Sequence, residues 1–398
     1  MPACRARIMG LYSTLRTRYT QYKPENTRGK GYFMYERAYE VASHFLLAQG
    51  EKHIAPYGNG HINDTFCVSV ETGAARPVRY ILQKVNRYVF PDPEGVIENI
   101  ERVTAYLRGV IESEGGDPTR ETLTLVESAD GGHSYTDADN QLWRVYLFIE
   151  DTISRDLPDT PELFALSGAA FGRFQRQLGG FDASTLHESI HDFHNTPARY
   201  RQLEDAVRRN DAGRLGEVGP ELAFCMERGE ETGTLLRALA AGEIPLRVTH
   251  NDTKLNNVLL DAATGRGVCV IDLDTVMPGL AAYDFGDSIR FGANTAAEDE
   301  RDLTKVSLSL PMFEAFVKGY LIEAGAALCA RERELLPMGA KLMTLECGMR
   351  FLADHLNGDK YFKVHHEGHN LDRARTQFAL VADMEKKWDA MMEIVKNA

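Results

Sequence analysis

The chain has 398 residues, of which 43% are hydrophobic and 26% charged, so it can form more than one structural unit around sizeable cores. Its formal net charge of −13 argues against a general nucleic-acid binder or an anionic-membrane binder. The six cysteines are scattered and form no C-x-x-C pair, which predicts neither a zinc cage nor a disulfide framework. We therefore expect a cytoplasmic protein, and no apolar run reaches transmembrane length.

The first part of the chain is basic and has no regular apolar pattern. Its only acid is Glu25, whereas lysine and arginine recur along the whole stretch. We expect residues 1–35 to be a disordered extension. A targeting segment is the alternative, because transit peptides are rich in arginine and poor in acids. A helix is predicted next, over residues 36–49.

A strand, a glycine-containing turn and a second strand are predicted over residues 54–70. The turn contains Gly58 and Gly60, which would let backbone amides come close to phosphate oxygens. Hairpin turns also use glycine for structural reasons, so the signal gains weight only from its position upstream of the polar segment described below.

More β-structure and one helix complete the predicted small lobe, which covers residues 36–150. The apolar spacing of residues 93–108 predicts the helix. Strands are expected at residues 78–85, 123–127 and 142–149, with a hairpin tip at residues 129–140. This lobe would then contain about five strands.

The remainder of the chain, residues 151–398, is predicted to be mainly helical. The first helix has a clear start, with Thr160 as its N-cap and Pro161 in its first position. Helices are expected at residues 161–178, 197–209, 221–240, 311–324, 331–356 and 373–396. We therefore predict an α+β protein with a small β-rich N-lobe and a larger, mainly helical C-lobe.

One polar segment in the helical part has an arrangement typical of phosphotransferases. It runs H-x-D-x-x-x-x-N from His250 through Asp252 to Asn257, and Asp272 follows an apolar run about fifteen residues later. Asp252 can accept the proton of an attacking hydroxyl, while Asn257 and Asp272 offer oxygen atoms to Mg²⁺. Phosphoryl transfer needs little beyond an oriented nucleophile and cations that neutralise phosphate charge.

These residues also have structural explanations. Asp252 and Asn257 could be ordinary turn residues, but a carboxylate that leaves a buried strand, as Asp272 does, usually has a partner or an ion. Asp284 begins a D-F-G sequence, yet it lies 32 residues after Asp252, whereas Asp272 lies 20 after it and directly follows a strand. We assign the metal to Asp272 and expect Asp284 to accept backbone hydrogen bonds from the catalytic segment.

Two groups of histidines, at residues 187–194 and 365–369, lack the H-E-x-x-H order and the accompanying cysteines of zinc sites. We expect structural or surface roles for them. The sequence also has no G-x-S-x-G elbow, which argues against a serine hydrolase.

The segment from His250 to Asn257, with Asp272, resembles the aminoglycoside phosphotransferase and choline kinase superfamily, whose members are small-molecule kinases. Longer strings resemble a narrower group, the bacterial N-acetylhexosamine 1-kinases, and lie at residues 56–63, 247–257, 285–292 and 346–354. The likeness runs from about Tyr39 to Gln377. It implies a two-lobed, protein-kinase-like fold with the nucleotide between the lobes.

The resemblance implies ATP-dependent phosphorylation of the anomeric hydroxyl of N-acetylglucosamine or N-acetylgalactosamine. Asp252 would be the base and would contact the sugar, and Asn257 and Asp272 would hold Mg²⁺. The other residues implied to approach the sugar are His61, Asn63, Arg350 and Tyr361. Those implied to contact ATP are Gly58, Gly60, Gln83 and the hinge residues Phe148, Ile149 and Glu150, where backbone groups would read the adenine edge. An ion pair at a helix surface is the alternative for Arg350.

One position departs from the superfamily pattern. The third strand of its members usually carries a Lys or Arg that steadies the α- and β-phosphates, whereas this chain has Gln83 followed by Lys84. Adjacent strand residues face opposite sides, so only one of the two can face the nucleotide. Either the register is shifted by one residue, or the phosphates are held without that lysine.

Two alternatives to the sugar kinase stay open. The first is a kinase of another small alcohol, such as choline, homoserine or an aminoglycoside. Cationic substrates would call for an acidic pocket, whereas Arg350 and His61 favour a neutral sugar. The second is a nucleotide-binding pseudokinase, but Asp252, Asn257 and Asp272 are all present. The expected partners are a nucleotide and a small sugar, and the pattern indicates no particular oligomeric state.

Overall fold

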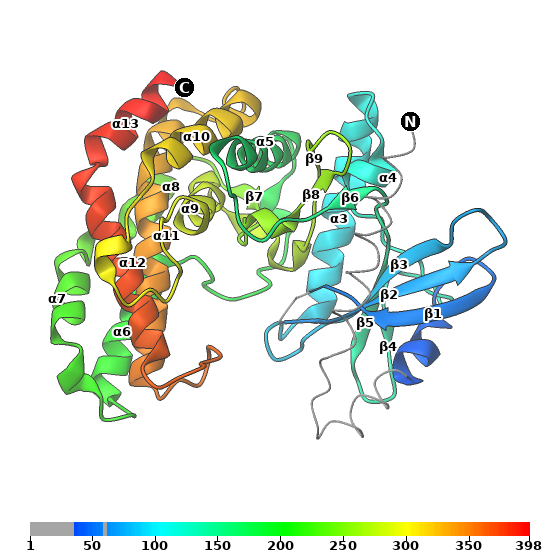
Figure 1. Ribbon diagram of the computed structural model, residues 1–398, viewed down its shortest axis with the longest axis horizontal. Coiled ribbons are helices and arrows are strands. Elements are labelled where there is room, and N and C mark those ends of the chain that lie inside the picture. The colour runs from blue at the N-terminus through cyan, green and yellow to red at the C-terminus, as the bar shows by residue number, and fades with distance from the viewer. Residues whose placement is uncertain (1–35, 59–61) are drawn as a thin grey trace, which may run out of the picture.

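The computed structural model describes residues 36–58 and 62–398. The predicted extension at residues 1–35, and Gly60 and His61 of the glycine turn, lie outside the described residues. The described chain forms two lobes, one built on an antiparallel sheet and the other mainly of helices (Figure 1). The predicted α+β class, with a small β-rich N-lobe and a larger helical C-lobe, is confirmed.

The sheet of the N-lobe has the strand order β1-β2-β3-β5-β4, and neighbouring strands are antiparallel. Its strands are β1 (Glu51–Pro56), β2 (Asp64–Glu71), β3 (Val78–Lys84), β4 (Tyr135–Thr136) and β5 (Leu142–Leu147). Apolar side chains at alternate positions, such as Val68, Leu82 and Val145, pack together on one face of the sheet. This alternation is the signal from which the strands were predicted.

Two predictions for the N-lobe are wrong in detail. Residues 123–127 form no continuous strand, because Leu125 makes only an isolated bridge with Tyr146 while β4 occupies the rest of the same edge of β5. The helix predicted at residues 36–49 ends at residue 42, and the chain after it turns to follow the sheet.

Helix α3 (Pro93–Ser113) lies between the sheet and the C-lobe (Figure 1). It starts where predicted, with Asp92 accepting the N–H of Gly95 at 3.0 Å, and continues past the predicted end. Its apolar stripe, which includes Ile100 and Leu107, belongs to the main hydrophobic core.

The C-lobe is built from helices that largely match the predicted ranges, apart from the helix over residues 281–292, which was not predicted. They are α5 (Pro161–Gln177), α6 (Thr196–Arg209), α7 (Gly219–Glu227), α8 (Thr234–Ala240), α9 (Ala281–Gly292), α10 (Leu310–Ala324), α11 (Ala330–Leu356), α12 (His369–Lys386) and α13 (Trp388–Asn397), and a short α4 (Pro118–Glu121) precedes β4. Thr160 caps α5 as predicted, accepting the N–H of Leu163 at 3.2 Å.

Two long predicted helices are each divided in the structure. A 3₁₀ turn at Glu230–Gly233 separates α7 from α8, at a place where glycines weaken the helix. The break between α12 and α13 falls at Lys387, whose ammonium group bonds the Ser307 hydroxyl at 2.7 Å and the Leu308 carbonyl at 2.8 Å. In both cases the apolar spacing continued across the break, so periodicity alone predicted one helix.

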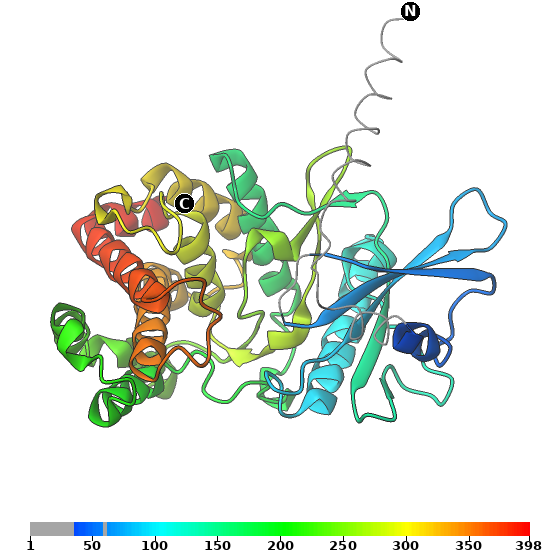
Figure 2. The same cartoon turned by 60° about the horizontal axis from the view of Figure 1, so that its bottom comes forward.

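Short strands interrupt the helices and carry the polar segment of interest. They are β6 (Thr152–Ile153), β7 (Arg247–Thr249), β8 (Val258–Asp261), β9 (Gly267–Val270) and β10 (Met277–Gly279). Strands β7 and β10 pair with each other, and β8 lies between β6 and β9 in a second small sheet. Figure 2 shows β8 and β9 between the C-lobe helices and the N-lobe.

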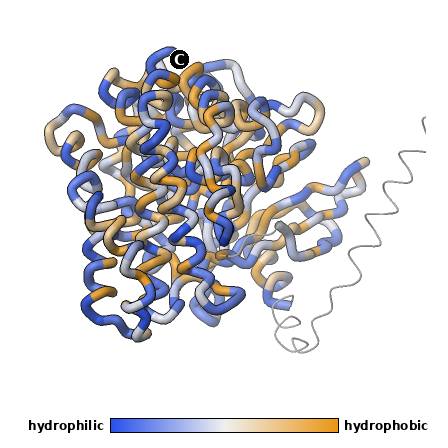
Figure 3. The backbone as a smooth tube through the Cα atoms, turned by 60° about the vertical axis from the view of Figure 1, so that its left-hand side comes forward, coloured by the Kyte–Doolittle hydropathy of each residue, from blue (hydrophilic) through white to orange (hydrophobic). Residues whose placement is uncertain are grey.

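The main hydrophobic core joins the two lobes. It combines residues of α3 with residues of the C-lobe helices, among them Phe285 and Phe316. A second core surrounds α11 and α12. Figure 3 shows hydrophobic and hydrophilic residues interspersed along the chain of the larger lobe. None of the helices in the described part is long and apolar enough to cross a bilayer.

Helix α9 lies directly against α11, and glycines permit this approach. A Cβ on Gly339 of α11 would lie 2.2 Å from the carbonyl oxygen of Ala282, and one on Gly286 of α9 would lie 2.3 Å from the carbonyl oxygen of Gly339. Backbone atoms cannot relieve such contacts by rotating a side chain. Since α9 also carries Asp284 and Asp287, these glycines help to set the position of both carboxylates.

We predict that Gly339→Ala destabilises the folded protein by about 1–3 kcal/mol, because α9 and α11 must separate to admit the methyl group. Gly109→Ala is the matched control. Gly109 is exposed on α3 and has no atom within 4 Å of an added Cβ, so alanine should stabilise the helix by up to about 1 kcal/mol. Urea unfolding measures both, and equal stability of the two variants would contradict the close packing.

Candidate active site

The polar segment after β7 is held by the carboxylate of Asp284 on α9. Its Oδ2 accepts the N–H of His250 at 2.9 Å, and its Oδ1 accepts the N–H of Asn251 at 2.8 Å. Burial raises the pKa of Asp284, although His250 and the two backbone donors oppose the rise. The prediction that Asp284 accepts backbone hydrogen bonds from this segment is confirmed.

The imidazole of His250 fixes the backbone around Asp252. Its Nε2 donates to the carbonyl oxygen of Ile271 at 2.8 Å, and its Nδ1 accepts the N–H of Asp252 at 3.2 Å. The rings of Phe171 and Phe174 pack against the imidazole edge to face. His250 therefore joins the predicted catalytic segment to the chain just before the predicted metal ligand.

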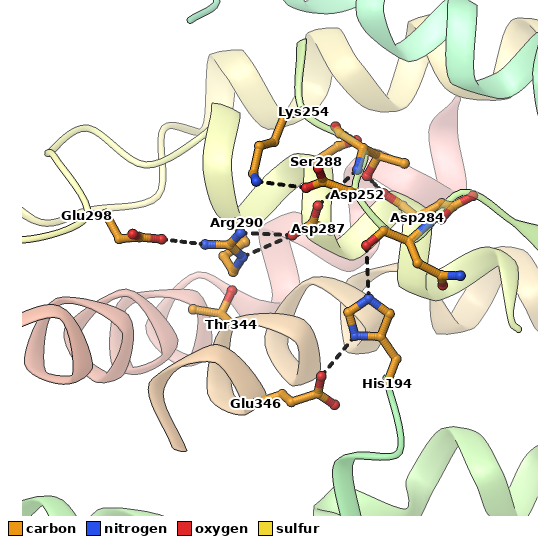
Figure 4. Close-up of polar contacts among 12 residues, drawn as sticks. His194, Asp252, Lys254, Asp284, Asp287, Ser288, Arg290, Glu298, Thr344 and Glu346 are labelled. Atoms are coloured by element: carbon orange, nitrogen blue, oxygen red, sulfur yellow. Dashed lines mark hydrogen bonds and ion pairs between the residues drawn. The ribbon is translucent and has the colours of Figure 1, made fainter. Parts of the chain in front are cut away.

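The side chain of Asp252 is 31% exposed and has two polar neighbours. Lys254 Nζ lies 2.8 Å from Oδ1 (Figure 4). Asn257 Nδ2 donates to Oδ2 at 3.1 Å and to the main-chain oxygen of Asp252 at 2.8 Å. These contacts orient the carboxylate while it stays accessible. Since the amide nitrogen of Asn257 is used in this way, its carbonyl oxygen points away from Asp252, and no described residue donates to it.

Asp272 follows β9 in a left-handed backbone conformation, with φ of 60°. Aspartate adopts this conformation more readily than most residues. Its side chain is accessible to solvent, yet protein lies on most sides of it. This desolvation, followed by repulsion from Asp274 and Asp252, raises the pKa of Asp272 to about 7. Carboxylates that repel one another in this way favour the binding of a cation.

A second carboxylate of α9 continues the network. Asp287 Oδ2 accepts the N–H of Thr253 at 3.0 Å, and its Oδ1 accepts hydrogen bonds from Arg290 at 2.9 and 3.1 Å. Burial opposes ionisation of Asp287, but Arg290 and Lys254 outweigh it and hold its pKa below the usual range. Arg290 also pairs with Glu298 at 3.1 Å (Figure 4). The main chain on both sides of the predicted base is therefore bound to α9.

His194 connects the same segment to α11. Its Nδ1 lies 2.8 Å from Glu346 Oε1, and its Nε2 lies 3.2 Å from the carbonyl oxygen of Asn251 (Figure 4). The other carboxylate oxygen of Glu346 accepts from the hydroxyl of Thr196 at 2.8 Å. The structural role expected for this histidine is confirmed, and the structure adds that the role supports the catalytic segment.

Arg350, one turn after Glu346 on α11, lies among aromatic rings. Its guanidinium carbon lies 5.4 Å from the ring centre of Phe193, 5.5 Å from that of Phe362 and 5.9 Å from that of Tyr361. The ion pairs within the described residues do not include Arg350, so the alternative of a helix-surface ion pair is wrong. We call these four residues the arginine–aromatic box.

The loop after α11 is shaped by Asp354. Its carboxylate accepts the N–H groups of Lys360, Tyr361 and Phe362 at 2.9 to 3.0 Å, which places the two aromatic rings of the box. Tyr361 is 56% exposed and so can contact a ligand. Because Phe193 of the box directly precedes His194, the box adjoins the segment that carries the predicted base.

The structure resolves the register of β3. Gln83 shares a face with Ile81, which packs against the main core, whereas Lys84 lies on the opposite face and pairs with Asp64 across the strand. The inward side chain is therefore the glutamine. Its Oε1 accepts hydrogen bonds from Arg144 at 2.8 and 3.1 Å.

Asn63 and Gly58 flank the part of the glycine turn that lies outside the described residues. Asn63 Nδ2 donates to Asp274 Oδ2 at 2.6 Å, and its Oδ1 accepts the N–H of Asn86 at 3.0 Å. Gly58 has a φ of 75°, with open space where a side chain would be. Both polar groups of Asn63 are thus in use, and its contact with a sugar stays a prediction.

Phe148, Ile149 and Glu150 lie where the chain leaves β5 for the C-lobe. The Ile149 carbonyl accepts the hydroxyl of Thr152 at 2.9 Å, and the Glu150 carbonyl accepts from Arg120 at 3.0 Å. By contrast, the Phe148 carbonyl and the Glu150 N–H have no hydrogen-bond partner in the described chain. An acceptor and a donor two residues apart suit the edge of a purine base.

Sequence reasoning missed several residues of this network. Asp287 could have been found, since it lies three residues after Asp284 on one helix and so shares its face. Lys254 sits inside the motif and was passed over. His194 was placed among structural histidines without a partner. Arg144 gave a subtler signal, a charge within an apolar strand.

A raised pKa makes ionised Asp272 destabilising in the metal-free protein. In the unfolded chain this carboxyl ionises at about pH 4, so the loss of folding stability begins there. It grows until the pH passes the pKa of Asp272 in the folded protein, about 7. We predict that Asp272→Asn raises the unfolding temperature in EDTA by a few degrees at about pH 8 and changes it little at about pH 4. Asp287→Asn, at a carboxyl whose pKa is lowered, should do the opposite at high pH. A less stable Asp272→Asn at high pH would contradict this electrostatic picture.

Solved structures of similar fold come from several small-molecule kinases. A microcompartment-associated aminopropanol kinase is 18% identical, with a TM-score of 0.60, covering 90% of this chain and 98% of that one. The choline kinase from Cryptosporidium parvum Iowa II is 14% identical, with a TM-score of 0.53 and coverages of 90% and 97%. The GDP complex of aminoglycoside 2′-phosphotransferase-IIIa is 12% identical, with a TM-score of 0.53 and coverages of 87% and 98%. At these identities the likeness concerns the fold.

The sequence itself matches a family model. The model described as "Phosphotransferase enzyme family" (APH) aligns with residues 53–315, from the first strand of the sheet into α10. The matched range contains Asp252, Asn257 and Asp272, which the fold brings around one segment. This chain belongs to the phosphotransferase enzyme family.

Proposed function

We propose that this protein transfers the γ-phosphoryl group of ATP to the anomeric hydroxyl of N-acetylglucosamine or N-acetylgalactosamine. The observation that carries the proposal is the arrangement around Asp252, an oriented and accessible carboxylate bonded to Asn257 and close to Asp272. The family supports phosphoryl transfer, and the aminoglycoside phosphotransferase solved with GDP supports a nucleotide donor for this fold.

The hinge supports a purine nucleotide. The Phe148 carbonyl would accept from an adenine amino group, and the Glu150 N–H would donate to a ring nitrogen. Arg79 stabilises this stretch, because its guanidinium lies 3.8 Å from the ring centre of Phe148 and its Nε donates to Glu150 at 2.9 Å. The nucleotide phosphates would then extend toward the glycine turn and Asp272.

The residues present fit a Mg²⁺ ion. Asn257 offers a carbonyl oxygen that no described residue uses, and Asp272 offers a carboxylate whose ionisation nearby acids oppose. Oxygen ligands of this kind are those that Mg²⁺ prefers. When bound, the ion would neutralise charge between the β- and γ-phosphates.

Asp252 would accept the proton of the sugar hydroxyl as that oxygen attacks the γ-phosphorus. Asn257 and Lys254 orient the carboxylate, while His250 and Asp284 hold the backbone beneath it. The contribution of these residues is to place the base and the hydroxyl, which is the main requirement of phosphoryl transfer.

The arginine–aromatic box supports a neutral sugar over a cationic alcohol. Arg350 lies near Arg199, whose pKa is lowered by burial and then by the charge of Arg350. Two guanidinium groups would repel an ammonium group. A sugar ring can lay its C–H face on Phe193 or Tyr361, and an N-acetyl carbonyl can accept a hydrogen bond from Arg350.

The test of the proposed function is ADP release with Mg²⁺-ATP across a panel of alcohols: N-acetylglucosamine, N-acetylgalactosamine, glucose, galactose, choline, homoserine and 1-aminopropan-2-ol. Turnover confined to N-acetylhexosamines, with an acid-labile phosphate on the product, is the expected result. Turnover only with the amino alcohols would overturn the sugar assignment. Nucleotide binding without turnover on any member would favour a pseudokinase.

We predict that Asp252→Asn lowers kcat by about 10²–10⁴-fold, because the amide cannot accept the hydroxyl proton. ADP affinity and unfolding temperature should stay close to those of the wild type, since the amide keeps the shape of the carboxylate. Glu298→Gln, an acid-to-amide change beyond Arg290, is the control and should keep near-normal kcat. Wild-type turnover by Asp252→Asn would remove Asp252 from the mechanism.

A further inference from the structure

The inward position of β3 carries no positive charge in this chain. Many kinases place a lysine there, which contacts the nucleotide phosphates and pairs with a glutamate of the following helix. Here Gln83 occupies the position. The acids Glu94 and Glu101 of α3, the helix that follows, pair with Arg87 and His133 instead.

Arg144 of β5 brings a positive charge to the same place. It lies directly opposite Gln83 in the ladder between β3 and β5, and cross-strand neighbours point to the same face. Gln83 Oε1 accepts from Arg144 Nε at 3.1 Å and from Nη2 at 2.8 Å. The glutamine thus orients a neighbouring cation.

The guanidinium reaches the predicted metal-binding segment. Arg144 Nη2 lies 2.5 Å from Asp274 Oδ1, two residues after Asp272. Arg144 is also among the charges that favour ionisation of Asp272. The other oxygen of Asp274 accepts from Asn63, beside the glycine turn. Arg144 therefore lies where the sheet, Asn63 and the predicted metal-binding segment meet.

Two buried donors at this place have no partner among the described residues. Arg144 Nη1 makes no hydrogen bond, although the side chain is only 1% exposed. The hydroxyl of Tyr146, two residues further along the same face of β5, makes none either. Buried polar groups nearly always have a partner, so neighbouring orphan donors indicate an acceptor that the described residues do not supply.

We propose that Arg144 contacts the phosphate oxygens of the bound nucleotide through Nη1, with Gln83 orienting the guanidinium and Asp274 balancing its charge before the nucleotide binds. This rests on the function proposed above, which puts a nucleotide between the lobes. Arginine suits the role, because it stays charged when buried and its planar group can hold Gln83 on one edge and a phosphate on another.

The binding of ADP and of adenosine, measured by calorimetry in EDTA, isolates the contribution of the phosphates from that of the metal. Arg144→Met should weaken ADP about 10–100-fold and leave adenosine within about twofold, whereas Arg144→Lys should restore part of the loss. Lys84→Met is the matched control on the opposite face of β3 and should keep the wild-type ratio of the two affinities.

Removal of Arg144 alone leaves the buried Asp274 without its cation, which lowers stability for reasons unrelated to phosphate. The double variant Arg144→Met/Asp274→Asn leaves no unpaired charge. Its affinities for ADP and adenosine are compared with those of the wild type at a temperature at which both proteins are folded. The proposal is overturned if the double variant keeps the wild-type preference for ADP over adenosine, or if Lys84→Met loses that preference instead. A wild-type protein that binds neither molecule would overturn the proposed function itself.

Discussion

The two hydrogen bonds that Asp284 accepts are the interaction on which the rest of the site depends. They fix consecutive backbone N–H groups of His250 and Asn251, immediately before the predicted base. The carboxylate can do this because α9 is buried and pressed against α11 through glycine contacts. Asp287 of the same helix accepts the N–H of Thr253, so one helix holds the segment on both sides of Asp252. Packing deep in the C-lobe thereby fixes the position of Asp252.

The chain as a whole is acidic, but most of the acids around the candidate site are paired. The net charge is −13, yet the acids around the site each meet a nearby cation or backbone donor, and Asp272 is the one held against repulsion. Asp287 has Arg290, Asp274 has Arg144, and Asp252 has Lys254. A site built this way has little positive charge to spare for phosphates, which explains why both a metal ion and Arg144 matter to the proposed chemistry.

The sequence predicted well what local pattern controls, and less well what depends on distant neighbours. The lobes, the first turn of α5 and the bracing role of Asp284 followed from periodicity, capping and spacing. The break at Lys387 did not, because it depends on contacts with Ser307 and Leu308 far along the chain. The hydrogen bonds between Gln83 and Arg144 could not be predicted for the same reason, because the pairing of two distant strands decides which residues lie opposite each other. The sugar specificity came only from resemblance.

In the proposed mechanism, Asp272 holds the metal of a metal–nucleotide complex beside Asp252. Electron paramagnetic resonance of Mn²⁺ in the presence of ADP tests it most directly, with the wild type, Asp272→Asn and the control Glu298→Gln. We expect a bound Mn²⁺ signal that depends on ADP, persists in Glu298→Gln and is lost in Asp272→Asn. An undiminished ADP-dependent signal in Asp272→Asn would contradict it and move the metal to another carboxylate.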